Sequence, residues 1–484
     1  MDCNSLRSHI IDSRFYRTGY STEEARLIFC DRRRLKRWLD VEVALATSQA
    51  NLGLIPLSAA EELMQTADLH QFNLKEIGHS IQSTNHSLIP LLSAWQNATT
   101  SQSAAYIHYG ATTQDIQDTA QSLEIKEVLS IVERDLCLVI KELIGLTRRT
   151  RNLIIVGRTH GQHALPTTLG LKIAVWLDEM LRNGERLQEC RKRVLVSQLF
   201  GGVGTMAAFS GQGLELLAEF SKRLKLSVPR TAWHSSRDRM AELLSFMAIL
   251  AGGLGKIANE ICQLARNEIC ELEEPFHLGK IGSTTMPHKR NPELCEQVVV
   301  LSRLIKNQAI SGFDGLINEH ERDYRSVRLE WLSLPESSIM LCCTLNLVKT
   351  ILKNLIIHEE RIAANLDKSA CHVCTEALIL GQGAKTGKQK AHDLIYELSM
   401  HAYASNRPLR ELLEENPGIT DQLKPNELAE LLKPENHIGV AQKLAEKTIT
   451  SAEEWLASRH PVEFSESICP LADNNGECTL RMED

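Results

Sequence analysis

The sequence predicts an all-α protein centred on a bundle of five long helices. Prolines number only 14 in 484 residues, and long stretches contain none. In those stretches apolar residues recur at helical spacing, whereas the alternation typical of strands is scarce. Because proline interrupts a helix interior, such segments favour an up-and-down bundle. The length exceeds one compact core, so we expect two or three domains or one elongated helical body.

Ahead of the bundle, residues 21–53 form the first predicted helical module. Ser21 and Glu24 fit a capping box at its start, and Gly53 fits a glycine stop at its end. Beyond the bundle, residues 391–450 predict short amphipathic helices interrupted by NRP, NPG and KPEN. From about Ser465 the chain is polar, and we expect a poorly ordered tail.

The bundle itself is expected from five segments: residues 119–151, 169–199, 240–272, 294–310 and 336–366. Within the third, residues 247–265 read MAILAGGLGKIANEICQLA and are apolar on more than one side. A helix that is apolar on several faces is buried on several faces. We therefore expect the bundle to pack against copies of itself.

The composition is that of an ordinary soluble protein, with 43% hydrophobic and 24% charged residues. A net charge of −7 argues against a general binder of nucleic acid or membrane surfaces. We find no signal peptide and no apolar run long enough to cross a bilayer. The 13 cysteines are odd in number and scattered, so we expect reduced thiols in a cytoplasmic protein.

The most informative stretch is KIGSTTMPHKRNP, residues 280–292. Small residues beside a glycine turn backbone N–H groups towards one anion, and Lys289 and Asn291 add a point charge and a neutral donor. A nearby cation lowers the pKa of the Ser283 hydroxyl, which could then take a proton from a carbon beside a carboxylate. Alone, the segment would be better interpreted as a solvated basic loop.

It does not stand alone, because residues 282–292 resemble the mobile-loop pattern GSSxMPxKxNP of the fumarase/aspartase superfamily of lyases. The one departure is Thr284, where the pattern has a second serine. The match is long and without gaps. The resemblance implies that Ser283 is the catalytic base and that Lys289 and Asn291 hold the substrate.

A second block, HYGATTQDIQDTA at residues 108–120, resembles the first conserved region of that superfamily. The resemblance places Thr112 and Thr113 on a substrate carboxylate, with His108 as a further contact. The same residues suit a helix start capped by Thr113, and both interpretations hold together because helix N-termini bind carboxylates.

A third block, GRTHGQHALPTT at residues 157–168, resembles the second conserved region. His160 then matches the general acid that protonates the leaving group, and Gln162 matches a substrate contact. Glu296 matches the carboxylate that holds this histidine, and such a partner raises a histidine pKa and fixes its tautomer. A lone histidine is more often structural, but this one lies in a matched motif.

The resemblance covers about residues 21–450 and implies a three-domain helical chain: 1–110 N-terminal, 111–365 central bundle, 366–455 C-terminal, with 456–484 as the tail. It implies a homotetramer with a twenty-helix core, whose active sites each gather three regions from three subunits. It implies no metal and no organic cofactor, and the histidines show no zinc spacing.

Two branches of the superfamily compete, adenylosuccinate lyase and 3-carboxy-cis,cis-muconate cycloisomerase. HERD at residues 320–323, with Arg322 as a substrate contact, is shared, but Val327, Arg328 and Trp331 replace the Ser-Ser and arginine that help adenylosuccinate lyases hold the nucleotide. Several segments, such as EWLSLPE, resemble the cycloisomerases.

Two histidines point to elimination instead. Bacterial cycloisomerases resemble GRTWLQHALP, with tryptophan at the place of His160, and elimination of an amine needs an acid close to nitrogen. His86 in STNHS resembles the histidine of the lyase pattern TxHD, although Ser87 replaces the aspartate. A helix-cap role for His86 is the alternative.

The sequence therefore predicts a lyase that releases fumarate by β-elimination from an N-succinyl compound, adenylosuccinate being the first candidate. A cycloisomerase, and a lyase for another succinylated amine or a nitrosuccinate-type substrate, are the alternatives. A catalytically silent structural relative is a third class, against which the intact His160, Ser283, Lys289 and Glu296 argue. The partner is a small dicarboxylate-containing substrate, with no nucleic acid and no membrane.

Overall fold

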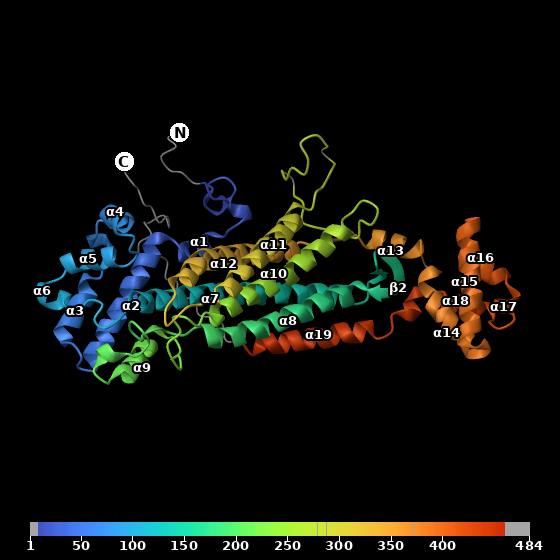
Figure 1. The fold of residues 1–484 in the computed structure, drawn as a ribbon. Coiled ribbons are helices and arrows are strands. Elements are labelled where there is room, and N and C mark those ends of the chain that lie inside the picture. The colour runs from blue at the N-terminus through green and yellow to red at the C-terminus, as the bar shows by residue number, and fades with distance from the viewer. Residues whose placement is uncertain (1–7, 278, 287, 370, 460–484) are drawn as a thin grey trace.

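The computed structural model describes residues 8–277, 279–286, 288–369 and 371–459. It is an elongated helical body with the N-terminal helices at one end, a long bundle in the middle and small C-terminal helices at the other end (Figure 1). The all-α fold class is confirmed. The expected tail from about Ser465 lies outside the described residues.

The N-terminal end contains helices α1 Glu23–Ile28, α2 Asp31–Asn51, α3 Leu57–Thr66, α4 Leu74–Thr84, α5 Ile89–Asn97 and α6 Ser101–Ala104. Helices α2 to α6 enclose a core of their own, which also receives α9, Gly213–Leu224, whereas Ala25 and Ile28 of α1 pack into the bundle core. Short 3₁₀ turns lie at Ile10–Asp12, Arg17–Gly19, Leu69–Gln71, Ala207–Phe209, His372–Cys374 and Pro434–His437.

The module predicted at 21–53 is two helices, and its first cap differs from the prediction. Thr22 caps α1, with its side chain accepting from the Ala25 N–H, while the Ser21 hydroxyl donates to the Arg17 carbonyl. The expected capping box of Ser21 and Glu24 is therefore wrong, because Thr22 is the cap and Ala25 lies three positions after it. Gly53 has φ +69° just beyond the end of α2, so its predicted role as a glycine stop is confirmed.

The five bundle helices are α7 Thr113–Thr150, α8 Leu169–Val194, α10 Asp238–Leu264, α11 Glu293–Asp314 and α12 Tyr324–Lys353. They share one large apolar core, so the five-helix bundle is confirmed. The second and third segments end earlier than predicted, at Val194 and Leu264 and not at 199 and 272. The bounds of the last segment, predicted as 336–366, are also wrong. Asp323 caps α12, the helix continues through Pro335, and residues 359–367 form the separate helix α13, Glu359–Asp367.

Two small antiparallel sheets lie at the end of the bundle away from the N-terminal helices. Strands β1, Ile154–Thr159, and β2, Gln162–Thr168, form a projecting hairpin between α7 and α8. Strands β3, Leu272–Glu273, and β4, Ile356–Ile357, join the segment before α11 to the segment after α12.

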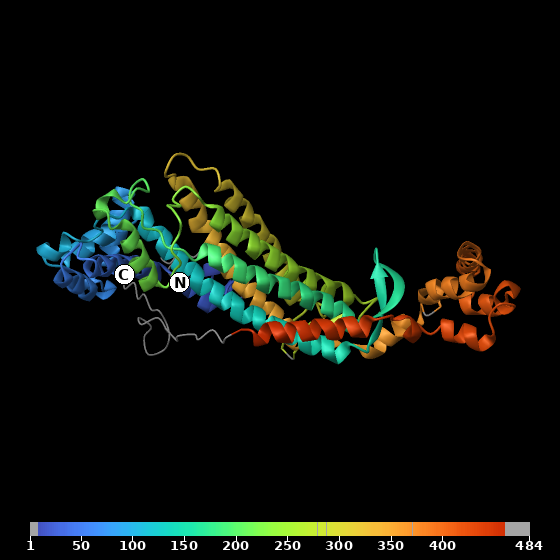
Figure 2. The ribbon, with the colours of Figure 1, turned by 90° about the horizontal axis from the view of Figure 1, so that it is seen from below.

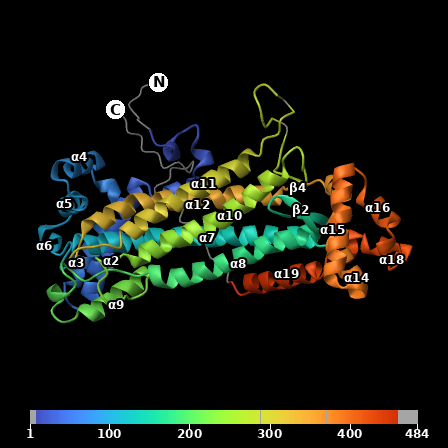
Figure 3. The same ribbon diagram turned by 45° about the vertical axis from the view of Figure 1, so that its right-hand side comes forward.

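The C-terminal helices are α14 Thr375–Thr386, α15 Lys388–Ser405, α16 Leu409–Glu415, α17 Pro417–Thr420, α18 Pro425–Leu431 and α19 Ala441–Ala457. The first five have a core of their own beyond the end of the bundle. The predicted interruptions are confirmed: Asn406 ends α15 in a left-handed conformation, and Asn416 caps α17. Helix α19 returns and lies along α8 (Figures 2 and 3).

By length and apolar composition alone, α10 and α12 could each cross a bilayer. In both helices 67% of the most apolar window is buried inside the bundle, which is the pattern of a core helix.

Candidate active site

The predicted site residues fall into three groups along the body. The first surrounds the start of α7, the second is the turn of the β1–β2 hairpin, and the third is the loop between β3 and α11 (Figure 1).

In the first group Thr112 is the N-cap of α7. Its hydroxyl accepts from the Asp115 N–H, and the Asp115 carboxylate accepts from the Thr112 N–H at 3.0 Å, which completes a capping box. The predicted cap, Thr113, is therefore wrong by one residue, and Thr113 is the first residue of the helix. Arg322, just before α12, donates to the Thr112 hydroxyl. A helix N-terminus, a hydroxyl and a guanidinium thus meet where a carboxylate is expected.

Asp115, which was not among the site residues predicted from the sequence, holds this turn on its buried side. It is fully buried and accepts from the N–H groups of Phe200 and Gly201 at 3.0 and 2.9 Å, and it pairs with His234 at 2.8 Å. The sequence signal was the acidic residue three positions after the cap, which is the second half of a capping box.

Two histidines accompany this group. His108 has φ +60° and its Nδ1 lies 2.6 Å from an oxygen of the buried Glu42. Burial lowers the pKa of His108, but the hydrogen bond and charge of Glu42 outweigh burial and leave that pKa raised. His86 accepts at Nδ1 from the N–H groups of Leu88 and Ile89 at 3.3 and 3.0 Å, so it has the helix-cap role at the start of α5.

The second group sits in a two-residue hairpin turn. His160 and Gly161 have φ +52° and +77°, the positive values that a type I′ turn requires at both positions. Both His160 and Gln162 are exposed. Among the described residues no hydrogen bond or ion pair joins His160 to Glu296, so one chain does not form the predicted acid–carboxylate pair. The hairpin was missed in the sequence, although the β-branched residues on both sides of His-Gly are a strand signal.

The third group is the loop with the Gly-Ser-Thr-Thr pattern. The Ser283 hydroxyl accepts from the Met286 N–H at 3.1 Å, and the Asn291 side-chain amide donates to the Gly282 carbonyl at 2.6 Å. A Cβ on Gly282 would lie 2.2 Å from the Lys289 carbonyl oxygen, so the close approach of the two loop arms requires glycine there. Glu296 follows in the first turn of α11.

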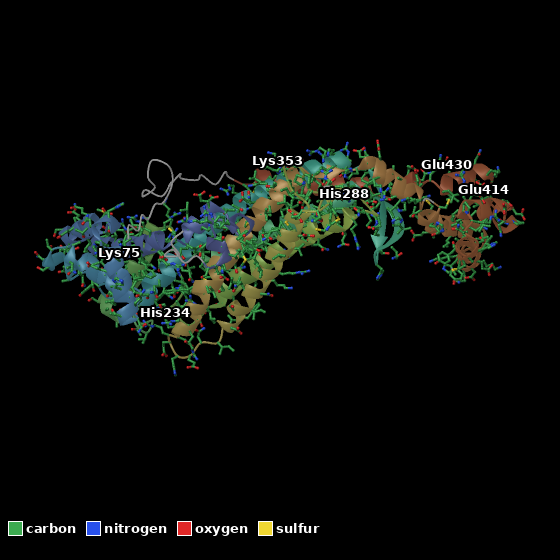
Figure 4. The ribbon with its side chains drawn as sticks, turned by 90° about the horizontal axis from the view of Figure 1, so that it is seen from above. Lys75, His234, His288, Lys353, Glu414 and Glu430 are labelled. Atoms are coloured by element: carbon green, nitrogen blue, oxygen red, sulfur yellow. The ribbon has the colours of Figure 1, made fainter. Side chains whose placement is uncertain are left out.

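The first group lies far from the other two within one chain. Helix α7 has 38 residues, so Thr112 and the hairpin that follows the helix are about 57 Å apart at about 1.5 Å per residue. Figure 4 shows His234, the partner of Asp115, and His288 of the third group on different parts of the elongated body. The second and third groups share one end of the bundle, where Arg158 of β1 binds Glu271 beside β3 at 2.6 and 2.8 Å.

The ten described cysteines are free, and no cluster of three or more potential metal ligands occurs among the described residues. Burial raises the pKa of the Cys371 thiol and raises that of Cys374 to about 11, which leaves both thiols poorly reactive at neutral pH.

Comparison with known proteins identifies the family. A model of the Lyase family matches residues 17–305, and a model of the adenylosuccinate lyase C-terminus matches residues 372–448. The chain is 41% identical to an N-acetyl-S-(2-succino)cysteine lyase of Dickeya dadantii, over 93% of this chain and 98% of the relative. It is 39% identical to an adenylosuccinate lyase of Pyrococcus abyssi, over 92% and 98%.

Among solved structures, a 3-carboxy-cis,cis-muconate lactonizing enzyme from Pseudomonas putida superimposes with a TM-score of 0.85 at 30% identity, over 92% of this chain and all of that one. These matches run through the N-terminal helices, the bundle and the C-terminal helices, and they include the three motif regions. The chain therefore belongs to the fumarase/aspartase superfamily, and it is a fumarate-releasing lyase.

Proposed function

We propose that the enzyme eliminates fumarate from a small thiol that carries a 2-succino group on sulfur, a substrate of the N-acetyl-S-(2-succino)cysteine type. Two observations support this choice of leaving group. The first is the 41% identity to a lyase of that name. The second, which carries the proposal, is the start of α12 beside the Arg322–Thr112 contact.

At the start of α12, the positions that hold the nucleotide in adenylosuccinate lyases carry other side chains in this protein. Val327 is 1% exposed and offers no polar group. Trp331 packs against Trp38 and Tyr324, with ring centroids 6.4 and 6.1 Å apart. Arg328, the third replacing residue, is exposed and lies 5.4 Å from the Tyr324 ring centroid, so one cation remains at this place. The buried valine and the clustered tryptophan are poorer phosphate donors than a serine or an arginine. A leaving group smaller than a nucleotide fits these residues better.

The proposed reaction breaks one C–H and one C–S bond. Ser283 takes a proton from the CH₂ carbon of the succino group, and the negative charge spreads onto the neighbouring carboxylate, held by Lys289, Thr112 and Asn291. The electron pair then forms the fumarate double bond as the C–S pair leaves with sulfur. His160 protonates the departing thiolate, and Ser283 and His160 regain their starting states by proton exchange with water.

We propose that this site forms only in a homotetramer. About 57 Å of helix separates Thr112 from the His160 turn in one chain, so a second chain must supply one of them to a common site. Since no hydrogen bond or ion pair joins His160 to Glu296 among the described residues of one chain, we further propose that His160 meets Glu296 of another subunit. Exposed apolar side chains on the bundle, among them Val175, Ile249, Ile310 and Phe313, suit such an assembly.

A substrate panel tests the proposal. The enzyme is incubated separately with N-acetyl-S-(2-succino)cysteine, adenylosuccinate and 3-carboxy-cis,cis-muconate, while fumarate, free thiol and lactone are measured. We expect equal amounts of fumarate and thiol from the first, with kcat/KM at least about tenfold higher than for adenylosuccinate. Turnover of adenylosuccinate with no thiol release would overturn the thioether assignment.

Adenylosuccinate is the second candidate. It is favoured by the match of residues 372–448 to the adenylosuccinate lyase C-terminus and by His160, whose type suits protonation of an amine nitrogen. Trp331→Arg with Val327→Ser should raise adenylosuccinate turnover if only these side chains exclude the nucleotide.

A further inference from the structure

Glu274, directly after β3, is a buried carboxylate with three donors. It is 2% exposed. Its Oε1 accepts from the Leu294 N–H at 3.1 Å and from the Lys280 ammonium at 2.5 Å, and its Oε2 accepts from the Cys295 N–H at 2.8 Å. An ionised carboxylate at so little exposure needs such partners, so this arrangement is specific to the anion.

The two backbone donors belong to the first turn of α11. Pro292, the N-cap residue of α11, has no side-chain cap hydrogen bond. Glu274 supplies the missing cap from 20 residues earlier in the chain, and its charge also suits the positive end of the helix. Glu296 lies in the same first turn. By capping this turn, Glu274 helps to fix the backbone from which the Glu296 side chain extends.

The third donor, Lys280, belongs to the first arm of the loop that carries Ser283. The second arm is held in a similar way, since Arg290 lies 2.6 Å from Glu273. Both cations also lie over the ring of Phe276, at 5.5 Å for Lys280 and 4.5 Å for Arg290. Both arms of the loop are therefore held by neighbouring carboxylates, Glu274 and Glu273.

We infer that Glu274 is a positioning residue of the reaction, which places the arm carrying Ser283 and the turn carrying Glu296 through one buried carboxylate. The inference rests on the proposed roles of Ser283 and Glu296. It assigns no contact between Glu274 and the substrate. A lateral shift of about 1 Å in reacting groups costs on the order of a hundredfold in rate, so loss of this anchor lowers kcat more than it raises KM.

Three variants distinguish the contact of Glu274 with the loop from its contact with the start of α11. Glu274→Gln keeps the side-chain length and one carbonyl acceptor but loses the charge that holds Lys280 and one of the two N–H bonds to α11. Lys280→Gln removes the charge that holds the first arm of the loop. Glu273→Gln removes the ion pair to Arg290 of the opposite arm and also the contact of Glu273 with His358 at 3.1 Å. Hydrogen exchange in the ligand-free enzyme is measured over peptides covering 280–286 and 293–299, with thermal unfolding as the check on folding.

We expect Glu274→Gln to speed exchange in both peptides, to lower kcat by about 10- to 100-fold and to shift the limb of the pH–rate profile that reports His160. Lys280→Gln and Glu273→Gln should speed exchange only in the loop peptide. Unchanged exchange and kcat within about twofold of wild type in a folded Glu274→Gln protein would overturn the inference.

If Glu274→Gln does not fold, Lys280→Gln decides. An unchanged loop peptide in that variant overturns the inference, and faster loop exchange with lower kcat supports it. The exchange measurement needs no substrate, so it stays informative if the thioether proposal fails. Activity is measured on whichever succino compound the wild-type enzyme turns over.

Discussion

At the scale of single residues, the side chains that do the proposed chemistry are surrounded by others that hold the backbone. Thr112 caps α7 and accepts a hydrogen bond from Arg322, and the Ser283 hydroxyl accepts a hydrogen bond from the Met286 N–H of the same loop. His160 occupies a turn position with positive φ. The geometry of the reacting groups is therefore set by turns and caps and not by the core of the bundle.

The leaving group can be identified from two single variants. A thiol has an ordinary pKa of about 8.5, so a thiolate leaves with less help from an acid than an amine does. We expect Ser283→Ala to lower kcat by about 10²–10⁴-fold on any succino substrate, because C–H removal is common to all. His160→Ala should cost several-fold less on a thioether than on a succinylated amine. Equal losses on both substrates would contradict a leaving-group role for His160.

The pair His108–Glu42 should make stability depend on pH. Because the pKa of His108 is raised in the folded protein, its pairing contributes fully below the unfolded pKa of about 6.5 and is lost as pH rises through the folded value. We expect the difference in unfolding free energy between wild type and His108→Gln to shrink as the pH rises above about 6.5. Urea unfolding at several pH values measures it, and a constant difference would refute the assignment.

At the scale of elements, the sequence predicted the helices that apolar periodicity defines and misplaced those that proline or a turn defines. The segment expected at 336–366 began directly after Pro335, yet α12 runs through that proline. Buried residues on both sides of it, such as Val327 and Leu334, keep the helix continuous where local propensity alone predicts a stop.

The site was predictable where a motif names each residue and unpredictable where support comes from afar. Ser283, Lys289 and Asn291 stand in one short motif. Asp115 and Glu274 act through partners up to 119 and 21 residues away, and no local pattern reveals such partners. In the proposed assembly, His160 and Glu296 come from different chains, and neither the sequence nor the structure of one chain gives their relative position.

Helix α19 is expected to depend on a single glycine of α8. A Cβ on Gly184 would lie 2.2 Å from the Trp455 ring, so Gly184→Ala must displace α19. We expect a loss of about 1–3 kcal/mol in unfolding free energy. Gly78→Ala in α4, where a Cβ meets nothing within 4 Å, is the matched control and should be neutral or slightly stabilising. Equal urea midpoints for the two variants would show that α19 adapts without cost.

The loop at 280–291 is predicted to close over the substrate. Its small residues and cations suit a lid, and its arms are held at Lys280 and Arg290 while Ser283 lies between them. Hydrogen exchange over Gly282–Lys289 should slow when fumarate is bound. Identical exchange with and without saturating fumarate would count against a lid.

At the scale of the whole molecule, the elongated shape is the strongest argument for shared sites. We expect wild-type protein to scatter light as a tetramer. Mixing inactive His160→Ala and Ser283→Ala proteins after mild dissociation should restore activity, since about one quarter of randomly assembled sites would contain neither change. An active monomer, or mixtures that stay inactive after confirmed subunit exchange, would exclude the shared site.

The length of α7 also constrains how such a chain can evolve. One residue inserted into its 38 would rotate everything beyond it by about 100° and shift it by about 1.5 Å, so the hairpin would face a different neighbour. Seven residues would restore the angle but move the turn by about 10 Å. Natural length variation should therefore be confined to other segments between helices. The number of residues from Thr112 to His160 should stay constant, because it sets the distance between the two.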